Sequence, residues 1–222
     1  MKNIYIIGAG GFGREVAWLI ERINEESQKT GKDLTWNIKG FIDDNETILG
    51  KQEDNYYVVG NCEYLMKKSE EIEVYAVCAI GSAKIRKSVI DKLKKSRVKF
   101  ATVIDPSVIL SDRVQIGEGT IICAGTIITV DIRIGDHVII NLDCTLGHDD
   151  IIHDYVTIYP SVNVSGNVEV GQCSELGTGM QIIQGKNIGT ESIIGAGAVV
   201  IRDIPDRCTA VGSPAKLIKF WK

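Results

Sequence analysis

The chain has 222 residues, of which 44% are hydrophobic and 24% charged, and these values of an ordinary globular protein exclude disorder as the global state. The formal net charge of −4 argues against a general nucleic-acid or membrane-surface binder. No run of 18 apolar residues is present, so no bilayer span is expected. The N-terminal apolar run is too short and too glycine-rich for a secretory signal, and the six cysteines form no CxxC pair. We therefore expect a cytoplasmic protein with reduced thiols.

Strand and helix patterns alternate over residues 1–103 and predict a small Rossmann-like domain with a parallel sheet. Apolar runs mark the strands, and apolar residues at helical spacing mark the helices. The expected elements, in chain order, are strand Asn3–Ile7, helix Arg14–Asn24, strand Trp36–Ile42, strand Glu73–Ile80 and helix Lys84–Ser96.

A glycine-rich GxGxxG loop lies between the first strand and the first helix, with its glycines at Gly8, Gly10 and Gly13. This context suits a nucleotide phosphate bound at a helix N-terminus. Asp43 and Asp44 close the second strand, where dinucleotide enzymes place an acid that binds a ribose. The domain is too small for two mononucleotide halves, so one nucleotide is expected rather than NAD. The alternative is a tight turn followed by solvated acids.

Residues 104–201 carry a strict repeat of six. Every sixth residue from Ile104 to Val200 is Ile, Leu or Val, and no helix or long strand has that period. A short strand followed by a sharp turn repeats every six residues. Three such strand–turn units form the three sides of a triangular coil of about 18 residues in a parallel β-helix. Glycine follows the aliphatic residue in seven hexads, where we expect it to supply left-handed backbone angles at the corners. Residues 202–222 are expected to cap the last coil.

His148 follows a corner glycine in a polar hexad and should project outward beside Asp149 and Asp150. An imidazole next to a carboxylate suits general-base chemistry because its pKa is near neutrality. The alternative is an ordinary surface histidine. Asp150 and Lys186 interrupt the repeat because they occupy the fifth hexad position, which is mostly small or β-branched, and such violations often occur at functional sites.

Two other features have weaker patterns. A metal site would need converging ligands, but His137 lies 16 residues before His153, out of phase with an 18-residue coil, so no metal is expected. Lys216, in the segment GSPAK, could meet coenzyme phosphates, or it could belong to a solvated cap. The repeat's cysteines Cys123, Cys144 and Cys173 are expected to have packing roles.

The segments GAGGFGREV, GFIDDN, AIGSAKIRK, the hexads with GHD, and GSPAK run through the whole chain. Together they resemble the sugar acyltransferases grouped with sialic-acid O-acetyltransferase, which include N-acetyltransferases of nucleotide-linked amino sugars in bacterial glycan pathways. The resemblance implies a left-handed β-helix, a homotrimer with active sites between neighbouring β-helices, and acetyl-CoA as co-substrate.

The resemblance also implies residue roles. His148 would be the general base and Asp149 its orienting acid. The nucleotide sugar would meet Gly8, Gly10, Gly11, Phe12, Gly13, Asp43, Asp44, Gly81 and Asn141, and acetyl-CoA would meet Gly166, Gly195, Ala196 and Lys216.

One departure affects the site: Thr157 stands where many relatives carry a histidine near the thioester. Acetylation of a sugar amine is the leading interpretation. Acetylation of a sugar hydroxyl, as on sialic acid, and a non-catalytic sugar-nucleotide-binding scaffold are the alternatives. No pattern in the sequence encodes the nucleotide base, the sugar or the acceptor position.

Overall fold

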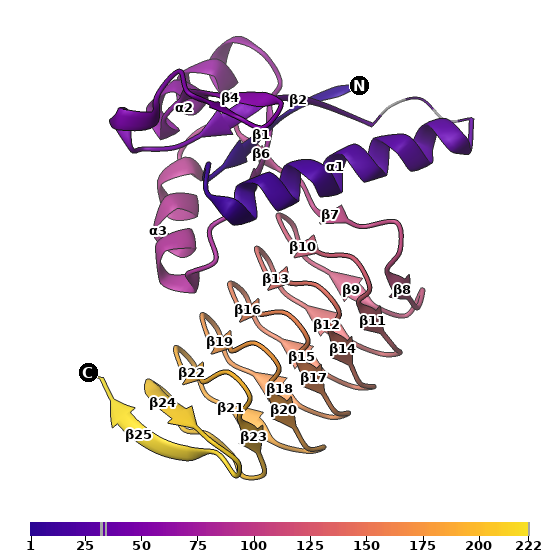
Figure 1. Cartoon of the computed structure of the whole chain (residues 1–222), viewed down its shortest axis with the longest axis vertical. Coiled ribbons are helices and arrows are strands. Elements are labelled where there is room, and N and C mark those ends of the chain that lie inside the picture. The colour runs from indigo at the N-terminus through magenta and orange to yellow at the C-terminus, as the bar shows by residue number, and fades with distance from the viewer. Residues whose placement is uncertain (32, 34, 222) are drawn as a thin grey trace. The chain divides into compact units, whose positions relative to one another are not determined.

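A computed structural model describes residues 1–31, 33 and 35–221, and the chain divides into two compact units (Figure 1). The first unit comprises Met1–Gly81 and Ile85–Pro106, and the second comprises Ser82–Lys84 and Ser107–Lys222. Our division of the chain into a first domain over 1–103, a β-helix over 104–201 and a capping tail over 202–222 stays a prediction.

The first unit is built on a sheet with strand order β3-β4-β2-β1-β5-β6. Neighbouring strands are parallel, except that β3 and β4 form an antiparallel hairpin. Side chains such as Ile4, Ile6 and Phe41 are completely buried, as expected for a parallel sheet. The elements are β1 (Lys2–Ile7), α1 (Gly11–Lys29), β2 (Trp36–Ile42), the short 3₁₀ helix η1 (Glu46–Ile48), β3 (Gln52–Glu53), β4 (Tyr56–Gly60), α2 (Cys62–Glu71), β5 (Tyr75–Cys78), α3 (Ala83–Leu93), β6 (Lys99–Phe100) and β7 (Val103–Ile104).

All five elements expected in this unit are present, but several bounds differ. The helix predicted from Arg14 begins at Gly11, so the last glycine of the GxGxxG motif lies in its first turn. The same helix continues past Asn24 to Lys29 through polar residues that show no apolar periodicity. β3, β4, α2 and β6 were not predicted.

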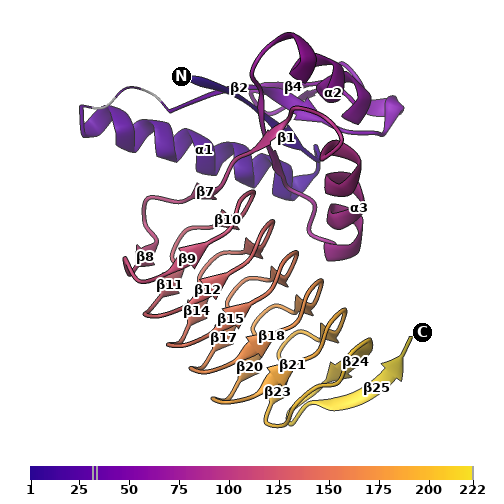
Figure 2. The same ribbon diagram turned by 180° about the vertical axis from the view of Figure 1, so that it is seen from behind.

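The second unit is a parallel β-helix (Figures 1 and 2). Its two-residue strands recur every six residues and pair with strands 18 residues away, as in Ile128↔Leu146 and Ile134↔Ile152. One face contains β10 (Ile121–Ile122), β13 (Ile139–Ile140), β16 (Thr157–Ile158), β19 (Glu175–Leu176) and β22 (Ile193–Ile194). The second contains β8 (Ile109–Leu110), β11 (Ile127–Ile128), β14 (Thr145–Leu146), β17 (Asn163–Val164), β20 (Gln181–Ile182) and β23 (Val199–Val200). The third contains β9 (Gln115–Ile116), β12 (Arg133–Ile134), β15 (Ile151–Ile152), β18 (Glu169–Val170) and β21 (Asn187–Ile188).

The hexad aliphatic residues form the core of this unit. Every one from Ile122 to Val200 is buried, whereas Ile104 and Ile116 are only half-buried and Leu110 is 38% exposed. Stacked equivalents therefore create a continuous apolar column, as the six-residue period predicted.

Our expectation for the corner glycines was wrong. Left-handed angles occur two residues later, at the fourth hexad position, which is occupied by residues as different as Asp149 (φ 62°) and Gly185 (φ 66°). The glycines directly after the aliphatic residue serve close approach instead. A Cβ on Gly147 would lie 2.4 Å from the nitrogen of Gly166, one coil further along. Glycine is therefore needed there because coils stack tightly, and not because of its freedom in φ.

The tail forms a hairpin at the end of the β-helix. β24 (Cys208–Val211) continues the first face in parallel with β22, and β25 (Lys216–Phe220) returns antiparallel to β24. No helix among the described residues is long and apolar enough to cross a membrane.

Candidate active site

The glycine-rich loop has two glycines that the protein itself requires. Gly8 adopts a left-handed φ of 99°, and a Cβ there would be 3.1 Å from the carbonyl oxygen of Ala79. A Cβ on Gly13 would be 2.0 Å from the carbonyl oxygen of Gly8. These two positions let α1 pack directly on the end of β1, as glycine does in nucleotide-binding loops.

Gly10 and Gly11 lie between these two glycines, and no close contact within the protein requires glycine at either position. A Cβ on Gly10 or Gly11 would meet nothing within 4 Å, so the protein leaves open space in front of the first turn of α1. Gly10 is the N-cap and supplies no side-chain hydrogen bond, and the first turn contains no acidic residue. The first amides of a helix have no acceptor within it. This end of α1, with Phe12 half-buried beside it, is therefore suited to an anion such as a phosphate.

The two acids after β2 are both engaged with the backbone. Asp43 accepts the Ala9 N–H at 3.0 Å and the Asn45 N–H at 2.9 Å. Asp44 accepts the Cys62 N–H at 2.9 Å and lies 3.8 Å from the ammonium of Lys92. These contacts hold the pKa of Asp44 below its usual value against the opposing effect of burial, which is the largest single influence. Asp43 thus fixes the glycine-rich loop, and its predicted contact with a ligand stays a prediction.

Gly81 lies in the loop after β5, at the same carboxyl edge of the sheet. The buried guanidinium of Arg86 donates to the carbonyl oxygens of Ile80 at 2.7 Å and Gly81 at 3.1 Å. Arg86 lies in the AIGSAKIRK segment and was not predicted as a site residue. The signal was a basic residue five positions after the loop glycine, on a helix otherwise marked by surface lysines.

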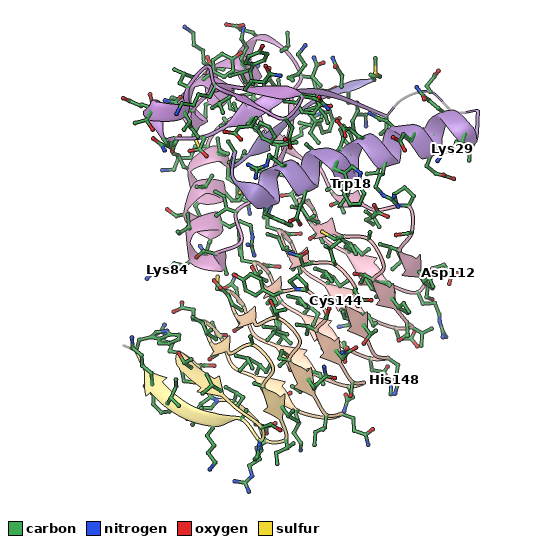
Figure 3. The ribbon with its side chains drawn as sticks, in the orientation of Figure 1. Trp18, Lys29, Lys84, Asp112, Cys144 and His148 are labelled. Carbon is green, nitrogen blue, oxygen red and sulfur yellow. The ribbon has the colours of Figure 1, made fainter. Side chains whose placement is uncertain are left out.

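His148 projects from the edge of the stacked coils (Figure 3), at the corner between β14 and β15. Its Nδ1 lies 2.8 Å from Oδ2 of Asp149, and the two side chains are 65% and 59% exposed. An ionised carboxylate can only accept, so Nδ1 carries the proton of the neutral ring. Nε2 then has a free lone pair, which is the arrangement that a general base needs.

The next coil holds this corner in place. The Asn167 N–H donates to the carbonyl oxygen of His148 at 2.7 Å. A Cβ on Gly166 would lie 2.6 Å from Nε2 of His148, so the imidazole lies directly over this glycine. Gly166, which we predicted to contact coenzyme, is thus adjacent to the candidate base.

The remaining predicted residues lie elsewhere on the chain. Asn141 follows β13 and Gly195 and Ala196 follow β22, at the corner between the first and second faces. Lys216 begins β25 and is exposed. The corner of His148 lies between the second and third faces, so one chain does not bring these groups to His148. Glycine at position 195 is also required by packing within the chain, because a Cβ there would be 2.7 Å from Cγ1 of Val211.

A second exposed histidine–carboxylate pair was not predicted. Nε2 of His153 lies 2.7 Å from Oε1 of Glu169, and both side chains are about half exposed. Among the described residues no three His, Cys, Asp or Glu side chains are placed to hold a metal ion.

Three comparisons place the chain among known proteins. Residues 3–93 match the family model of the PglD N-terminal domain. The chain is 32% identical over 225 residues to GDP-perosamine N-acetyltransferase from Escherichia coli O157:H7, covering 98% of this chain and 97% of that protein.

Solved structures agree with the sequence comparison. A histidine-to-asparagine mutant of perosamine N-acetyltransferase from Caulobacter crescentus, in complex with CoA and GDP-perosamine, is 30% identical with a TM-score of 0.85 over 99% of this chain and 98% of its own. The acetyltransferase domain of PglB from Neisseria gonorrhoeae FA1090, in complex with acetyl coenzyme A, is 29% identical with a TM-score of 0.85 over 98% and 99%. This chain therefore belongs to the family of sugar N-acetyltransferases that join a PglD-type N-terminal domain to a left-handed β-helix of hexapeptide repeats.

Proposed function

We propose that the protein transfers the acetyl group of acetyl-CoA to the amine of a nucleotide-linked amino sugar, with His148 as general base. The observation that carries this proposal is the His148–Asp149 pair at 2.8 Å, which leaves Nε2 unprotonated over Gly166 at an exposed corner. The relatives with CoA and GDP-perosamine bound support the choice of both substrates.

The reaction follows from this geometry. The sugar amine attacks the thioester carbonyl, and Nε2 of His148 accepts the proton that the nitrogen loses. The C–S bond of the tetrahedral intermediate then breaks, and the proton on His148 goes to the CoA sulfur. Asp149 stabilises the imidazolium between these steps. We assign the oxyanion to a backbone N–H at the Gly166 corner, because preorganised amides stabilise such charge.

The open end of α1 would take the phosphates of the nucleotide. Gly10 and Gly11 leave space that no protein atom fills within 4 Å of a built Cβ, and the helix N-terminus favours negative charge. Gly8, Phe12, Gly13, Asp43, Asp44 and Gly81 would shape the rest of this site, with Asp43 acting through the Ala9 amide.

A homotrimer would complete the acetyl-transfer site. His148 and Gly166 lie at one corner of the coils, whereas Asn141, Gly195 and Ala196 lie at another. Corners of two neighbouring chains could supply both sets, as the family resemblance implies. We further propose that the enzyme works in the cytoplasm, where acetyl-CoA and sugar nucleotides are available.

The experiment compares two histidine variants of the full chain. His148→Ala should reduce kcat by about 10²–10⁴-fold, with the amine acceptor toward the lower end because an amine attacks without full deprotonation. His153→Ala is the matched control, since it also removes an exposed histidine paired with a carboxylate at 2.7 Å, and it should retain activity. CoA release and product mass are measured with GDP-perosamine first, and then with UDP-, dTDP- and CMP-linked amino sugars.

The outcomes separate the alternatives. Full activity in His148→Ala would overturn the assignment of the base. Product formed only with a hydroxyl acceptor would favour O-acetylation of a sugar, and nucleotide binding without CoA binding would favour a non-catalytic scaffold.

A further inference from the structure

One buried acid next to the candidate base has no role in the reaction described above. Asp150 occupies the fifth hexad position, which points into the coils, and its side chain is completely buried. In other coils the buried polar residues at this position are Thr120, Thr126, Cys144, Ser174 and Ser192, and the half-buried Lys186 also occupies it. Each of these carries a hydrogen that it can donate, whereas an ionised carboxylate does not.

The polar residues at this position share one hydrogen-bonding pattern. Oγ1 of Thr120 accepts the N–H of the residue 18 positions later, Val138, at 3.1 Å, and donates to the carbonyl oxygen 15 positions later, that of Gly135, at 3.0 Å. Oγ of Ser174 does the same with the N–H of Ser192 at 3.0 Å and the carbonyl oxygen of Gly189 at 2.6 Å. A donor and an acceptor in one side chain thus link successive coils.

Asp150 shows the first half of this pattern. Its Oδ1 accepts the Val168 N–H, again 18 residues later, at 2.9 Å. Its Oδ2 is buried and has no hydrogen-bond partner among the described residues. The carbonyl oxygen 15 positions later, which accepts from the hydroxyl in the other coils, is that of Ser165. An acceptor-only oxygen cannot bond to a carbonyl, but a protonated one can.

The surroundings favour the neutral acid. Burial raises the pKa of Asp150 to about 7, against the opposing effects of hydrogen bonds from Val168 and Gly147 and of the charge of His148, while Asp149 adds to the rise. The residues at the same position one coil before and after are Ile132 and Val168, which carry no charge. His148 and Asp149 are the ionisable groups whose charges act on it.

The same short segment fixes the catalytic corner. The Asn167 N–H donates to the carbonyl oxygen of His148, and the next amide, that of Val168, donates to Asp150. Gly166, on which the imidazole lies, directly follows Ser165. A bond from Oδ2 to the Ser165 carbonyl would thus join the turn that carries the base to the turn beneath it.

We propose that Asp150 is a protonated carboxylic acid whose Oδ2–H donates to the carbonyl oxygen of Ser165, and that it acts as a positioning residue for His148 and Asp149. The positioning role rests on the proposed function, whereas the protonation state does not.

The first test measures whether the Asp150 side chain carries a proton. Asp150→Asn keeps an acceptor for Val168 and a donor for Ser165, so it imitates the neutral acid at every pH. An acid with a raised pKa in the folded state loses stability as pH rises from its unfolded value near 4 to its folded value near 7. The Tm of Asp150→Asn minus that of the wild type should therefore grow by about 5 °C or more between pH 4.5 and 8. Infrared difference spectra should show the carbonyl band of a protonated acid only in the wild type. Parallel Tm curves and no such band would overturn the proposal.

The second test measures positioning. Asp150→Val matches the residues at this position in neighbouring coils, so it should fold, yet it offers neither donor nor acceptor. We expect its kcat to fall about tenfold, as misplaced catalytic groups cause, with the KM for acetyl-CoA unchanged. Asp150→Ser, which restores the pattern of Ser174, and Asp150→Asn should recover kcat to within about threefold, because both keep a donor for Ser165. Wild-type kcat in Asp150→Val would overturn the positioning role.

The two proposals fail in different ways. A wild-type chain that transfers no acetyl group would overturn the proposed function, but the Tm and infrared comparison would still decide whether Asp150 holds a proton.

Discussion

The imidazole of His148 lies over Gly166 so closely that a single methyl group on Gly166 would be 2.6 Å from Nε2 and 2.7 Å from Cε1. The backbone of Gly166 is not in the left-handed region, so alanine fits the backbone and conflicts with the ring. The absence of a side chain at Gly166 therefore determines the position of the His148 imidazole.

Gly166→Ala should displace the imidazole and lower kcat by about 10²-fold, the order expected when a catalytic group moves by an ångström, while the fold is kept. The measurement is a double-mutant cycle in kcat and Tm with His148→Ala. In the background without the ring, Gly166→Ala should have no further effect on kcat. An equal loss in both backgrounds would show that Gly166 acts through the backbone and not through His148.

The two kinds of glycine in the first loop should respond differently to alanine. Gly13→Ala places a Cβ 2.0 Å from a backbone oxygen, so it should destabilise the first unit by more than about 2 kcal/mol, as overpacking does. Gly10→Ala meets nothing within 4 Å, so it should leave Tm unchanged but weaken nucleotide binding in calorimetry by about tenfold or more if phosphates approach the backbone there. Unchanged nucleotide affinity in Gly10→Ala would place the nucleotide elsewhere.

The hexads predicted the β-helix correctly because the core alone requires an aliphatic residue at every sixth position. Local pattern could not reveal α2 (Cys62–Glu71) or the β3–β4 hairpin. α2 is a short polar helix. In the hairpin, residues 56–59 are all Tyr or Val although Tyr57 is exposed and Val58 is buried, so the sequence does not display the alternation of burial. Their formation depends on tertiary pairing, which a single sequence does not display.

The candidate site was predictable in part. The residue types at His148 and Asp149 indicated general-base chemistry, and the register indicated an outward side chain. The reasons for individual glycines were not accessible, since Gly147 and Gly166 are required by atoms 18 residues or more away along the chain. The same distance concealed the bond between Val168 and Asp150.

Cys144 should not form an acyl intermediate. Its thiol is buried and donates to the carbonyl oxygen of Tyr159 at 3.2 Å, and burial raises its pKa to about 11. The thiolate, which is the nucleophile, is therefore scarce at neutral pH. Cys144→Ser keeps the same hydrogen bond and should retain kcat within about twofold, since the chemistry does not pass through sulfur. A burst of CoA release in the wild type that is absent from the serine variant would contradict direct transfer.

The ion pair between Arg22 and Asp105 should contribute more to stability than any exposed pair on the same helix. The guanidinium donates to both carboxylate oxygens, from Nε at 2.6 Å and from Nη2 at 3.1 Å, and the Asp105 side chain is only 1% exposed. Removing one member of a buried pair leaves the other charge desolvated. Arg22→Leu should therefore lower the free energy of unfolding by about 3–5 kcal/mol in urea titrations.

Arg14→Leu is the matched control for Arg22, because Arg14 also lies on α1 and pairs with Glu53 at 3.2 Å, but with 41% and 30% of the two side chains exposed. An exposed pair contributes little, so this variant should cost less than about 1 kcal/mol. The double variant Arg22→Leu/Asp105→Asn should recover part of the loss, because the amide carries no charge to desolvate. Equal losses for Arg22→Leu and Arg14→Leu would mean that water reaches Asp105 and that its burial does not determine the strength of the pair.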